Sequence, residues 1–294
     1  MAVVIAVPGN EEQATQLASR LGVEQVAAEV RQFPDGEIYV RIETDLAGHD
    51  AILVGSLYPS PAERFLTVAF LAATARDHGA RKVGLVAPYL AFMRQDHQFK
   101  PGEGITSKYF ASMVSQAVDW MVTVDPHLHR HHSLDGLYSI PTTIARSAPA
   151  IANWIATEVS HPYLIGPDAE SAQWVSVIAE KCGAPFVILE KTRRGDRDVS
   201  VSPPPTGGWN GHTPVLIDDI VSTGKTMIEA TRQLRAAGSA APMCVAIHAV
   251  FADTVLDELM SAGAAGIVTC DTIVHTSNRI CVAEHIAEAA KSYL

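Results

Sequence analysis

Three blocks of the sequence recur, in the same order, in the two halves of the chain. The first block is VVIAVPGN in one half and PYLIGPDAES in the other, each followed by a helical stretch that ends in Leu-Gly or Cys-Gly. The second is DAILVGSLYPSPAE against TPVLIDDIVSTGKT, and the third is MVTVDPH against IVTCDTI. Ordered repetition indicates a duplicated structural unit. It predicts two similar domains, residues 1–145 and 146–294, with the last helix, Val282–Leu294, packing on either of them.

Short apolar runs alternate with stretches of helical period along both halves. Nearly continuous apolar runs are typical of strands buried on both faces of a parallel sheet. We expect strands at Val3–Val7, Ala51–Gly55, Val83–Ala87, Trp120–Val124, Pro162–Gly166, Phe186–Leu189, Pro214–Ile217, Val245–Val250 and Gly266–Cys270. We expect helices at Glu11–Leu21, Glu63–His78, Ser107–Val118, Glu170–Cys182 and Thr226–Ala237. The alternation predicts an α/β fold with parallel sheets flanked by helices.

Charge and hydropathy limit the classes of ligand and the cell compartment. The formal net charge is −10, so the chain lacks the basic excess that nucleic acids or anionic membranes require. The longest apolar stretch, residues 83–93, is too short to span a membrane, and the N-terminus has the pattern of a buried strand. Four cysteines without close pairing predict buried free thiols. We therefore expect a cytoplasmic protein that binds neither nucleic acid nor membrane.

The segment VLIDDIVSTGKT carries the clearest chemistry of the second half. A hydrophobic strand leads to Asp218 and Asp219, and the small polar residues 222–226 then open a helix. Backbone N–H groups, hydroxyls and a helix N-terminus can hold a phosphate, while the carboxylates suit ribose hydroxyls. A Walker A loop is excluded, because its first glycine would fall at Asp219. An ordinary strand–turn–helix connection remains as the alternative.

The equivalent segment of the first half lacks these groups. It has Gly55 and Ser56 where the second half has the two aspartates. It also has Pro61 and Glu63 in the region where a phosphate would lie. We expect the first copy to have kept the strand–loop–helix structure without the phosphate site.

The loop at 218–226 resembles the phosphoribosyl pyrophosphate loop shared by type I phosphoribosyltransferases and ribose-phosphate diphosphokinases. Further segments resemble the diphosphokinases: FPDGEIYVRI, PYLAFMRQDHQF, VDPHLHRHH, IGPDAESAQ and ILEKTRRGDRDVSV. The resemblance covers essentially the whole chain. It implies two tandem type I phosphoribosyltransferase-like domains.

In that family the first two of these segments bind ATP. The resemblance implies that the ATP-binding residues are Phe33, Asp35, Gly36, Glu37, Arg94, Gln95, Asp96 and His97. The aromatic ring would stack on the adenine of a neighbouring subunit, and Arg94 would bind phosphate oxygens. From the residues alone, a plain β-hairpin and a solvated loop remain the alternatives.

The other three segments carry the metal and the transfer chemistry in the family. The resemblance implies His127 and Asp168 as ligands of Mg²⁺, and Lys191 and Arg193 as catalytic residues. The ribose 5-phosphate site would comprise Arg193, Asp218, Asp219, Ser222, Thr223, Gly224, Lys225 and Thr226. The residues alone permit a helix N-cap at Asp168 and a basic surface loop around residues 191–194. His129, His131 and His132 are additional to the family pattern, and we expect them in a solvated loop.

The implied reaction transfers the diphosphoryl group of ATP to the C1 hydroxyl of ribose 5-phosphate, with AMP as the other product. The partners implied are ATP, ribose 5-phosphate and further copies of the chain, as a dimer or a hexamer. A phosphoribosyltransferase and a non-catalytic regulatory homologue are the alternatives. Phosphate-activated members carry an R-G-x-D-V stretch, but residues 47–51 here are AGHDA, so we expect weak phosphate activation.

Overall fold

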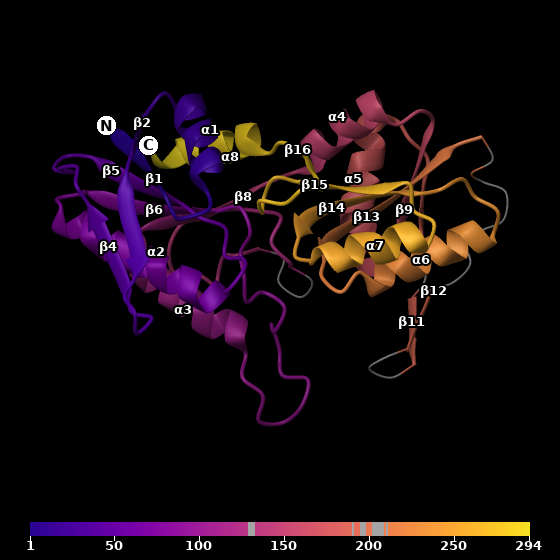
Figure 1. Ribbon diagram of the computed structural model, residues 1–294, viewed down its shortest axis with the longest axis horizontal. Helices are drawn as coiled ribbons and strands as arrows, with labels where there is room; N and C mark the ends of the chain where they lie inside the picture. The colour runs from indigo at the N-terminus through magenta and orange to yellow at the C-terminus, as the bar shows by residue number, and fades with distance from the viewer. Residues whose placement is uncertain (129–132, 190, 195–197, 202–208, 210) are drawn as a thin grey trace. The chain divides into compact units, whose positions relative to one another are not determined.

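A computed structural model of the chain describes residues 1–128, 133–189, 191–194, 198–201, 209 and 211–294. For residues 191–194, 198–201 and 253 it describes the backbone alone. The chain divides into two compact units, which are coloured along the sequence in Figure 1. Unit 1 comprises Met1–Arg146 and Ala283–Leu294, and unit 2 comprises Ser147–Val282.

Unit 1 is built on a six-stranded parallel sheet with the order β2-β1-β5-β6-β7-β8. Its strands are β1 (Ala2–Ala6), β2 (Glu24–Val26), β5 (Asp50–Val54), β6 (Lys82–Ala87), β7 (Trp120–Val124) and β8 (Thr142–Ala145). Its helices are α1 (Glu11–Leu21), α2 (Pro61–Asp77), α3 (Thr106–Ala117) and α8 (Ala283–Ala290), followed by a 3₁₀ turn, η2 (Lys291–Tyr293). A separate antiparallel hairpin pairs β3 (Ala28–Gln32) with β4 (Ile38–Ile42).

Unit 2 repeats this plan with the strand order β10-β9-β13-β14-β15-β16. Its strands are β9 (Pro162–Gly166), β10 (Phe186–Ile188), β13 (Thr213–Val221), β14 (Met243–Ala249), β15 (Gly266–Cys270) and β16 (Asn278–Ile280). Its helices are α4 (Ala148–Glu158), η1 (Ala169–Ser171), α5 (Ala172–Cys182), α6 (Lys225–Ala236) and α7 (Asp253–Ser261). A hairpin of β11 (Lys191–Arg194) and β12 (Asp198–Val201) follows β10.

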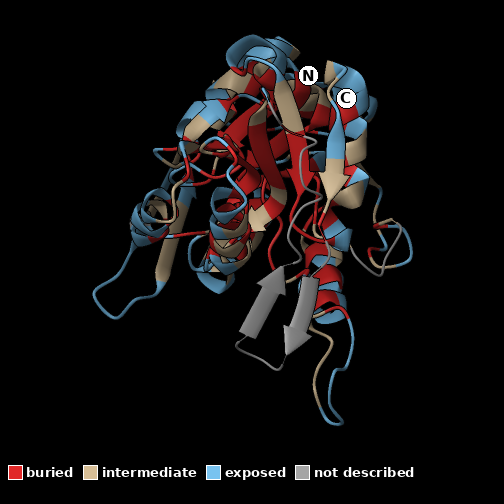
Figure 2. Cartoon of the chain, turned by 90° about the vertical axis from the view of Figure 1, so that its right-hand side faces the viewer, coloured by how far each residue is buried: buried red, intermediate tan, exposed pale blue. Residues whose placement is uncertain are grey.

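The α/β fold with parallel sheets flanked by helices is confirmed. Every residue of β7 is buried, as expected for a central strand covered on both faces. Figure 2 shows the buried residues gathered in the strands and the exposed residues on the outer helix surfaces and loops. Four predicted helix ends fall next to glycines with positive φ, at Gly22, Gly79, Gly183 and Gly238. None of the described helices is long and apolar enough to cross a membrane.

Some elements differ from the sequence-based expectation. β13 runs on to Val221 instead of ending at Ile217, because Ile220 and Val221 continue the pairing with β14. Helix α4 was not expected so close to Pro149, but proline is tolerated in the first turn of a helix. None of the four cysteines forms a disulfide, but only Cys244 and Cys270 are buried, whereas Cys182 is partly exposed and Cys281 is exposed. Its neighbours Ile280 and Val282 are buried, so the extended chain directs Cys281 outward.

The last helix packs within unit 1. Helix α8 contacts α1, β7 and β8. Beyond it, the Tyr293 ring stacks on Trp120 with a centroid distance of 4.5 Å and an interplanar angle of 8°. The Tyr293 hydroxyl also shares a 2.6 Å hydrogen bond with Thr143. The end of the chain thus completes the side of the sheet that carries β7 and β8.

Candidate active site

The candidate residues of unit 2 follow the carboxyl ends of neighbouring parallel strands. β9 pairs with both β10 and β13, all in the same direction. Asp168 comes two residues after β9, and Ser222 comes directly after β13. Parallel strands present their carboxyl ends at one edge of the sheet, where open α/β sheets bind ligands. The fold of unit 2 therefore places these two segments at the same edge.

The two aspartates of β13 are held by backbone N–H groups next to them. Asp218 Oδ1 accepts a hydrogen bond of 3.0 Å from the Asp219 N–H. Asp219 Oδ1 accepts one of 2.7 Å from the Ile220 N–H, and the Asp219 residue is only 4% exposed. Bonds from N–H groups to a carboxylate are charge-assisted and fix its orientation. The pair is thus a pre-oriented set of acceptors for hydroxyl groups.

The loop after β13 turns sharply into helix α6 at Gly224. Gly224 has φ +68° and stands at the N-cap position, and its carbonyl accepts the Ile228 N–H at 2.8 Å. A Cβ at this position would lie 2.4 Å from Val255 Cγ1, so only glycine fits. The N–H groups of a first helical turn have no partner within the helix and favour anions. Residues 222–226 therefore form a cradle of polar groups of the kind that can hold a phosphate.

Asp168 caps the short helix η1. Its Oδ1 accepts the N–H groups of Glu170 at 3.1 Å and Ser171 at 3.3 Å. The Ser171 Oγ accepts the Asp168 N–H at 3.5 Å, which completes a capping box, and the Ser171 hydroxyl donates to the Asp168 carbonyl at 2.6 Å. The aspartate is 8% exposed, so its carboxylate is held in a fixed position close to the surface of this edge.

The two candidate catalytic residues lie on the hairpin that follows β10. Lys191 is paired with Val201, and Arg193 with Val199, in the β11–β12 ribbon. Strand β12 contacts helix α6, whose N-terminus forms the phosphate cradle. The side chains of both residues lie outside the described part of the chain, so their role stays a prediction.

In unit 1, the candidate residues also follow neighbouring parallel strands. β6 pairs with β7, so the segment from Arg94 to His97 and the segment from Asp125 to His127 leave the same edge of the sheet. Arg94 and His97 are exposed, whereas Asp96 is 7% exposed. His129, His131 and His132 lie outside the described residues.

Asp125 begins the turn that leads to His127. The Asp125 residue is 2% exposed and has φ +28°, a conformation that few side chains adopt. Its Oδ1 accepts a hydrogen bond of 3.1 Å from Arg146, and its N–H donates to the Ala145 carbonyl at 3.2 Å. A buried carboxylate needs a counter-charge, and Arg146 supplies positive charge here. Sequence reasoning missed Arg146, because nothing local indicates a partner twenty-one positions away.

The β3–β4 hairpin presents Phe33 at its tip. The Phe33 N–H donates to the Glu37 carbonyl at 2.8 Å, and Asp35 Oδ1 accepts the Glu37 N–H at 3.1 Å. The Phe33 ring is 40% exposed and meets the Tyr39 ring edge-on, with centroids 6.0 Å apart. The guanidinium of Arg31 lies over both rings, at 4.9 and 4.1 Å from their centroids. The tip is thus an ordered aromatic surface.

In unit 1, the strand–loop–helix that corresponds to residues 213–226 is β5, its loop and α2. A side chain of α2 bonds to the loops of this unit. Arg64, in the first turn of α2, donates to the carbonyls of Ser56 at 2.5 Å and Pro8 at 3.0 Å, and to Asn10 Oδ1 at 2.5 Å. Burial lowers the pKa of the Arg64 guanidinium, while the charges of Glu11 and Glu63 oppose that shift. Sequence reasoning missed this contact, because no local pattern links residues 54 positions apart.

No group of three or more His, Cys, Asp or Glu side chains able to hold a metal ion occurs among the described residues. His127 belongs to unit 1 and Asp168 to unit 2. Mg²⁺ commonly uses one or two protein ligands and completes its coordination with water and substrate phosphates. The role of His127 and Asp168 as metal ligands therefore stays a prediction.

Comparisons with known proteins cover both units. Residues 2–117 match the model of the N-terminal domain of ribose phosphate pyrophosphokinase, and residues 133–289 match the phosphoribosyl transferase domain. A ribose-phosphate pyrophosphokinase of Methanopyrus kandleri is 31% identical over 292 residues, which is 99% of this chain and 99% of the relative. One of Sulfurisphaera tokodaii is 30% identical over 91% of this chain and 92% of its own.

A solved structure has the same fold. The phosphoribosylpyrophosphate synthetase of Mycobacterium smegmatis matches with a TM-score of 0.83 over 99% of this chain and 98% of that chain. The two sequences are 23% identical, so the likeness concerns the fold.

Proposed function

The chain belongs to the ribose-phosphate pyrophosphokinase family, and on that premise we propose how its residues carry out the family's reaction. The enzyme transfers the diphosphoryl group of ATP to the C1 hydroxyl of ribose 5-phosphate, which yields phosphoribosyl pyrophosphate and AMP. Unit 2 binds the sugar phosphate and unit 1 binds the nucleotide. The observation that carries this assignment is the phosphate cradle beside two oriented aspartates, which unit 2 has and unit 1 lacks.

Residues 222–226 hold the 5-phosphate of ribose 5-phosphate. The helix N-terminus and the close approach permitted by Gly224 support this role. Asp218 and Asp219 accept hydrogen bonds from the ribose hydroxyls, because their carboxylates are held at the end of β13. Arg193 adds positive charge from the hairpin that follows β10.

ATP is bound by the hairpin tip and the loop after β6. Phe33 stacks on the adenine, and Asp35, Gly36 and Glu37 meet the edge of the base. The exposed, ordered ring of Phe33 supports this assignment. The triphosphate is bound by residues that follow β6, namely Arg94, Gln95, Asp96 and His97.

The transfer step needs positioning and charge neutralisation. The C1 oxygen attacks the β-phosphorus of ATP in line, the bond from that phosphorus to the α-phosphate oxygen breaks, and AMP leaves. Lys191 and Arg193 stabilise the negative charge that gathers on the transferring phosphates. His127 and Asp168 would each supply a ligand to Mg²⁺, which would neutralise phosphate charge.

The experiment that tests this function is AMP release from ATP and Mg²⁺, with and without ribose 5-phosphate. We expect AMP only when ribose 5-phosphate is present, together with a product that a purine phosphoribosyltransferase can consume. Absence of AMP with the folded protein would refute the assignment. Consumption of phosphoribosyl pyrophosphate with a base would point instead to a phosphoribosyltransferase.

We also propose that the chain self-associates and that the hairpin of one subunit serves the nucleotide of another. The exposed residue Phe33 at the tip of a separate two-stranded ribbon supports this arrangement. A mixture of Phe33→Ala and Lys191→Ala variants tests it. If two inactive variants regain activity on mixing, the hairpin acts between subunits; if they do not, it acts within one.

A further inference from the structure

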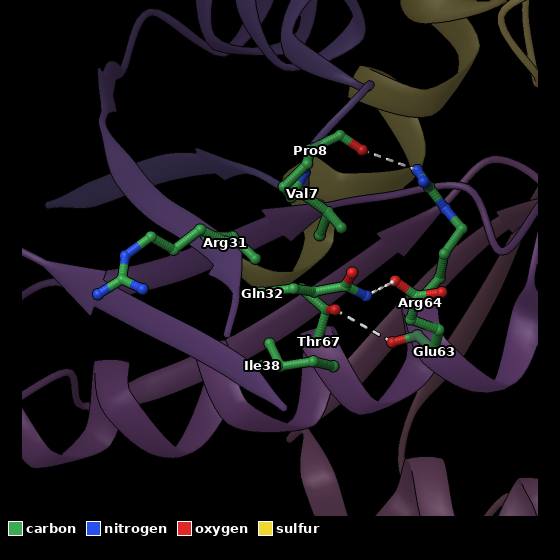
Figure 3. A pocket seen from close by; sticks show the side chains of 9 residues that line it. Val7, Pro8, Arg31, Gln32, Ile38, Glu63, Arg64 and Thr67 are labelled. Atoms are coloured by element: carbon green, nitrogen blue, oxygen red, sulfur yellow. Dashed lines mark hydrogen bonds between the residues drawn. The ribbon is translucent and has the colours of Figure 1, made fainter. Parts of the chain in front are cut away.

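The β3–β4 hairpin has two different faces. Val30, Arg31, Gln32 and Ile38 line a cavity of about 190 Å³, together with residues just after β1 and in the first turns of α2. The guanidinium of Arg31 lies over the rings of Phe33 and Tyr39 on the other face, and Tyr39 is directly opposite Arg31 across the ribbon. Figure 3 shows Gln32 pointing toward Glu63 of α2, while Arg31 points away from it. One face therefore meets the helix and the other presents the aromatic tip.

The hairpin depends on side chains for its orientation. It forms a two-stranded sheet of its own and shares no strand pairing with the six-stranded sheet of unit 1. An isolated two-stranded hairpin is marginally stable in water, so it needs packing against another element. Helix α2 contacts β4, which supplies that packing along the apolar part of the inner face.

One polar contact joins the hairpin to the helix close to the tip. Gln32 Nε2 donates a hydrogen bond of 2.6 Å to Glu63 Oε1, across 31 positions of sequence. Gln32 is the last residue of β3 and directly precedes Phe33. The tip turn is closed by the bond from the Phe33 N–H to the Glu37 carbonyl, so the tip moves with Gln32.

The helical end of this contact is rigid. The Glu63 carbonyl accepts the Thr67 hydroxyl at 3.0 Å within the first turns of α2. The next residue, Arg64, is bonded to Ser56, Pro8 and Asn10, which belong to the loops after β5 and β1. The backbone at the start of α2, from which the Glu63 side chain extends, is therefore fixed relative to the sheet of unit 1.

We propose that Glu63 is a positioning residue for nucleotide binding, acting through Gln32 to hold the Phe33 hairpin. This inference rests on the proposed function, because it takes Phe33 as the residue that stacks on the base. The proposal also assigns a function to the first copy of the strand–loop–helix, to which α2 belongs. Where the second copy binds a phosphate, the first copy anchors the hairpin that carries the nucleotide-binding ring.

The test compares variants that break the contact with one that keeps it. Gln32→Leu and Glu63→Leu remove the hydrogen bond, whereas Glu63→Gln keeps an acceptor oxygen and removes only the charge. We expect each breaking variant to raise the KM for ATP by about three- to tenfold, the range of a net hydrogen-bond contribution. The kcat and the KM for ribose 5-phosphate should stay at the wild-type values. Glu63→Gln should behave nearly as wild type.

Two further measurements separate positioning from a general loss of stability. The double variant Gln32→Leu/Glu63→Leu should be no worse than the poorer single variant, because both remove the same contact. Gln25→Leu is the matched control. It breaks an exposed side-chain hydrogen bond of 2.7 Å with Thr15 elsewhere in unit 1, and it should leave the KM for ATP unchanged.

Amide hydrogen exchange of residues 33–37, measured without nucleotide, tests the contact independently of activity. We expect faster exchange in Gln32→Leu and Glu63→Leu than in wild type or Glu63→Gln. Unchanged exchange would overturn the proposal even if the protein made no AMP. An unchanged KM for ATP in both breaking variants of an active enzyme, or additive effects in the double variant, would also overturn it. Absence of AMP from the wild type would instead refute the proposed function.

Discussion

Replacement of Gly224 by alanine should damage the ribose 5-phosphate site through one identifiable contact. The new Cβ would lie 2.4 Å from Val255 Cγ1 and 3.3 Å from Ile228 Cδ1, both on helices packed beside the loop. The residue also has φ +68°, where alanine is disfavoured by about 1–2 kcal/mol. Overpacking a core contact costs about 1–3 kcal/mol more. We expect Gly224→Ala to lower the free energy of unfolding by about 2–5 kcal/mol.

A variant of a second glycine in the same unit separates the backbone cost from the cost of the steric collision. Gly183 has φ +66°, and a Cβ there would meet no atom within 4 Å. Gly183→Ala should therefore cost only the backbone part, about 1–2 kcal/mol. The difference between the two variants measures the collision with Val255. Adding Gly224→Ala to a Val255→Ala background should cost only slightly more than the Gly183 control, because the 3.3 Å contact with Ile228 Cδ1 is then the close contact that remains.

Urea unfolding and the KM for ribose 5-phosphate are the measurements. We expect Gly224→Ala to raise that KM strongly, since the loop must shift to admit the methyl group, and Gly183→Ala to leave it unchanged. Equal losses of stability in the two variants, with no change in KM, would show that the loop is not packed as described.

The remaining predictions concern single side chains. Arg64→Met should destabilise the protein by about 1–3 kcal/mol in urea unfolding, because three acceptors lose their donor; a change under 0.5 kcal/mol would contradict this. Lys191→Ala should lower kcat far more than it weakens ribose 5-phosphate binding, and an unchanged kcat would remove Lys191 from the mechanism. Burial raises the pKa of the Cys244 thiol to about 12. The unfolded thiol loses its proton near pH 9 while the folded one keeps it, so this contribution to stability is complete below pH 9 and is lost as pH rises above it. Mass spectrometry after alkylation at pH 8 should accordingly find Cys281 modified and Cys244 intact. Millimolar phosphate should change the rate little, and a strong activation would refute the inference drawn from residues 47–51.

The interior strands were predictable because a continuous apolar sequence indicates burial on both faces of a sheet. Trp120–Val124 and Gly266–Cys270 are continuous apolar runs, and both form strands with the predicted bounds. The edge strand β2, with the sequence EQV, is exposed at Glu24 and buried only at Val26, and it carries no such run. Its existence depends on pairing with β1, which a local pattern does not encode.

For the site, the sequence predicted which segments take part, but not which side chains hold those segments in place. The strand–loop–helix at 213–226 was evident from two acids, a glycine and hydroxyl residues in sequence. The groups that hold such segments in place come from distant positions, as with Arg64 on Asn10 and Arg146 on Asp125. Each contact replaces hydration by a buried hydrogen bond, and neither partner stands out in its local context. The roles of Lys191 and Arg193 stay predictions, because their side chains lie outside the described part.

The packing of the last helix against the first has a consequence for how the protein is made. A ribosome releases unit 2, residues 147–282, before it has synthesised the residues that α1, β7 and Trp120 need as neighbours. Unit 1 begins first and is therefore finished last, and the nascent chain carries an incomplete sheet face while unit 2 is synthesised. Exposed apolar surface of this kind is where growing chains associate wrongly or recruit chaperones. The time between completion of β8 and arrival of α8, set by a length of 137 residues (283 − 146), is the period in which this protein is most vulnerable.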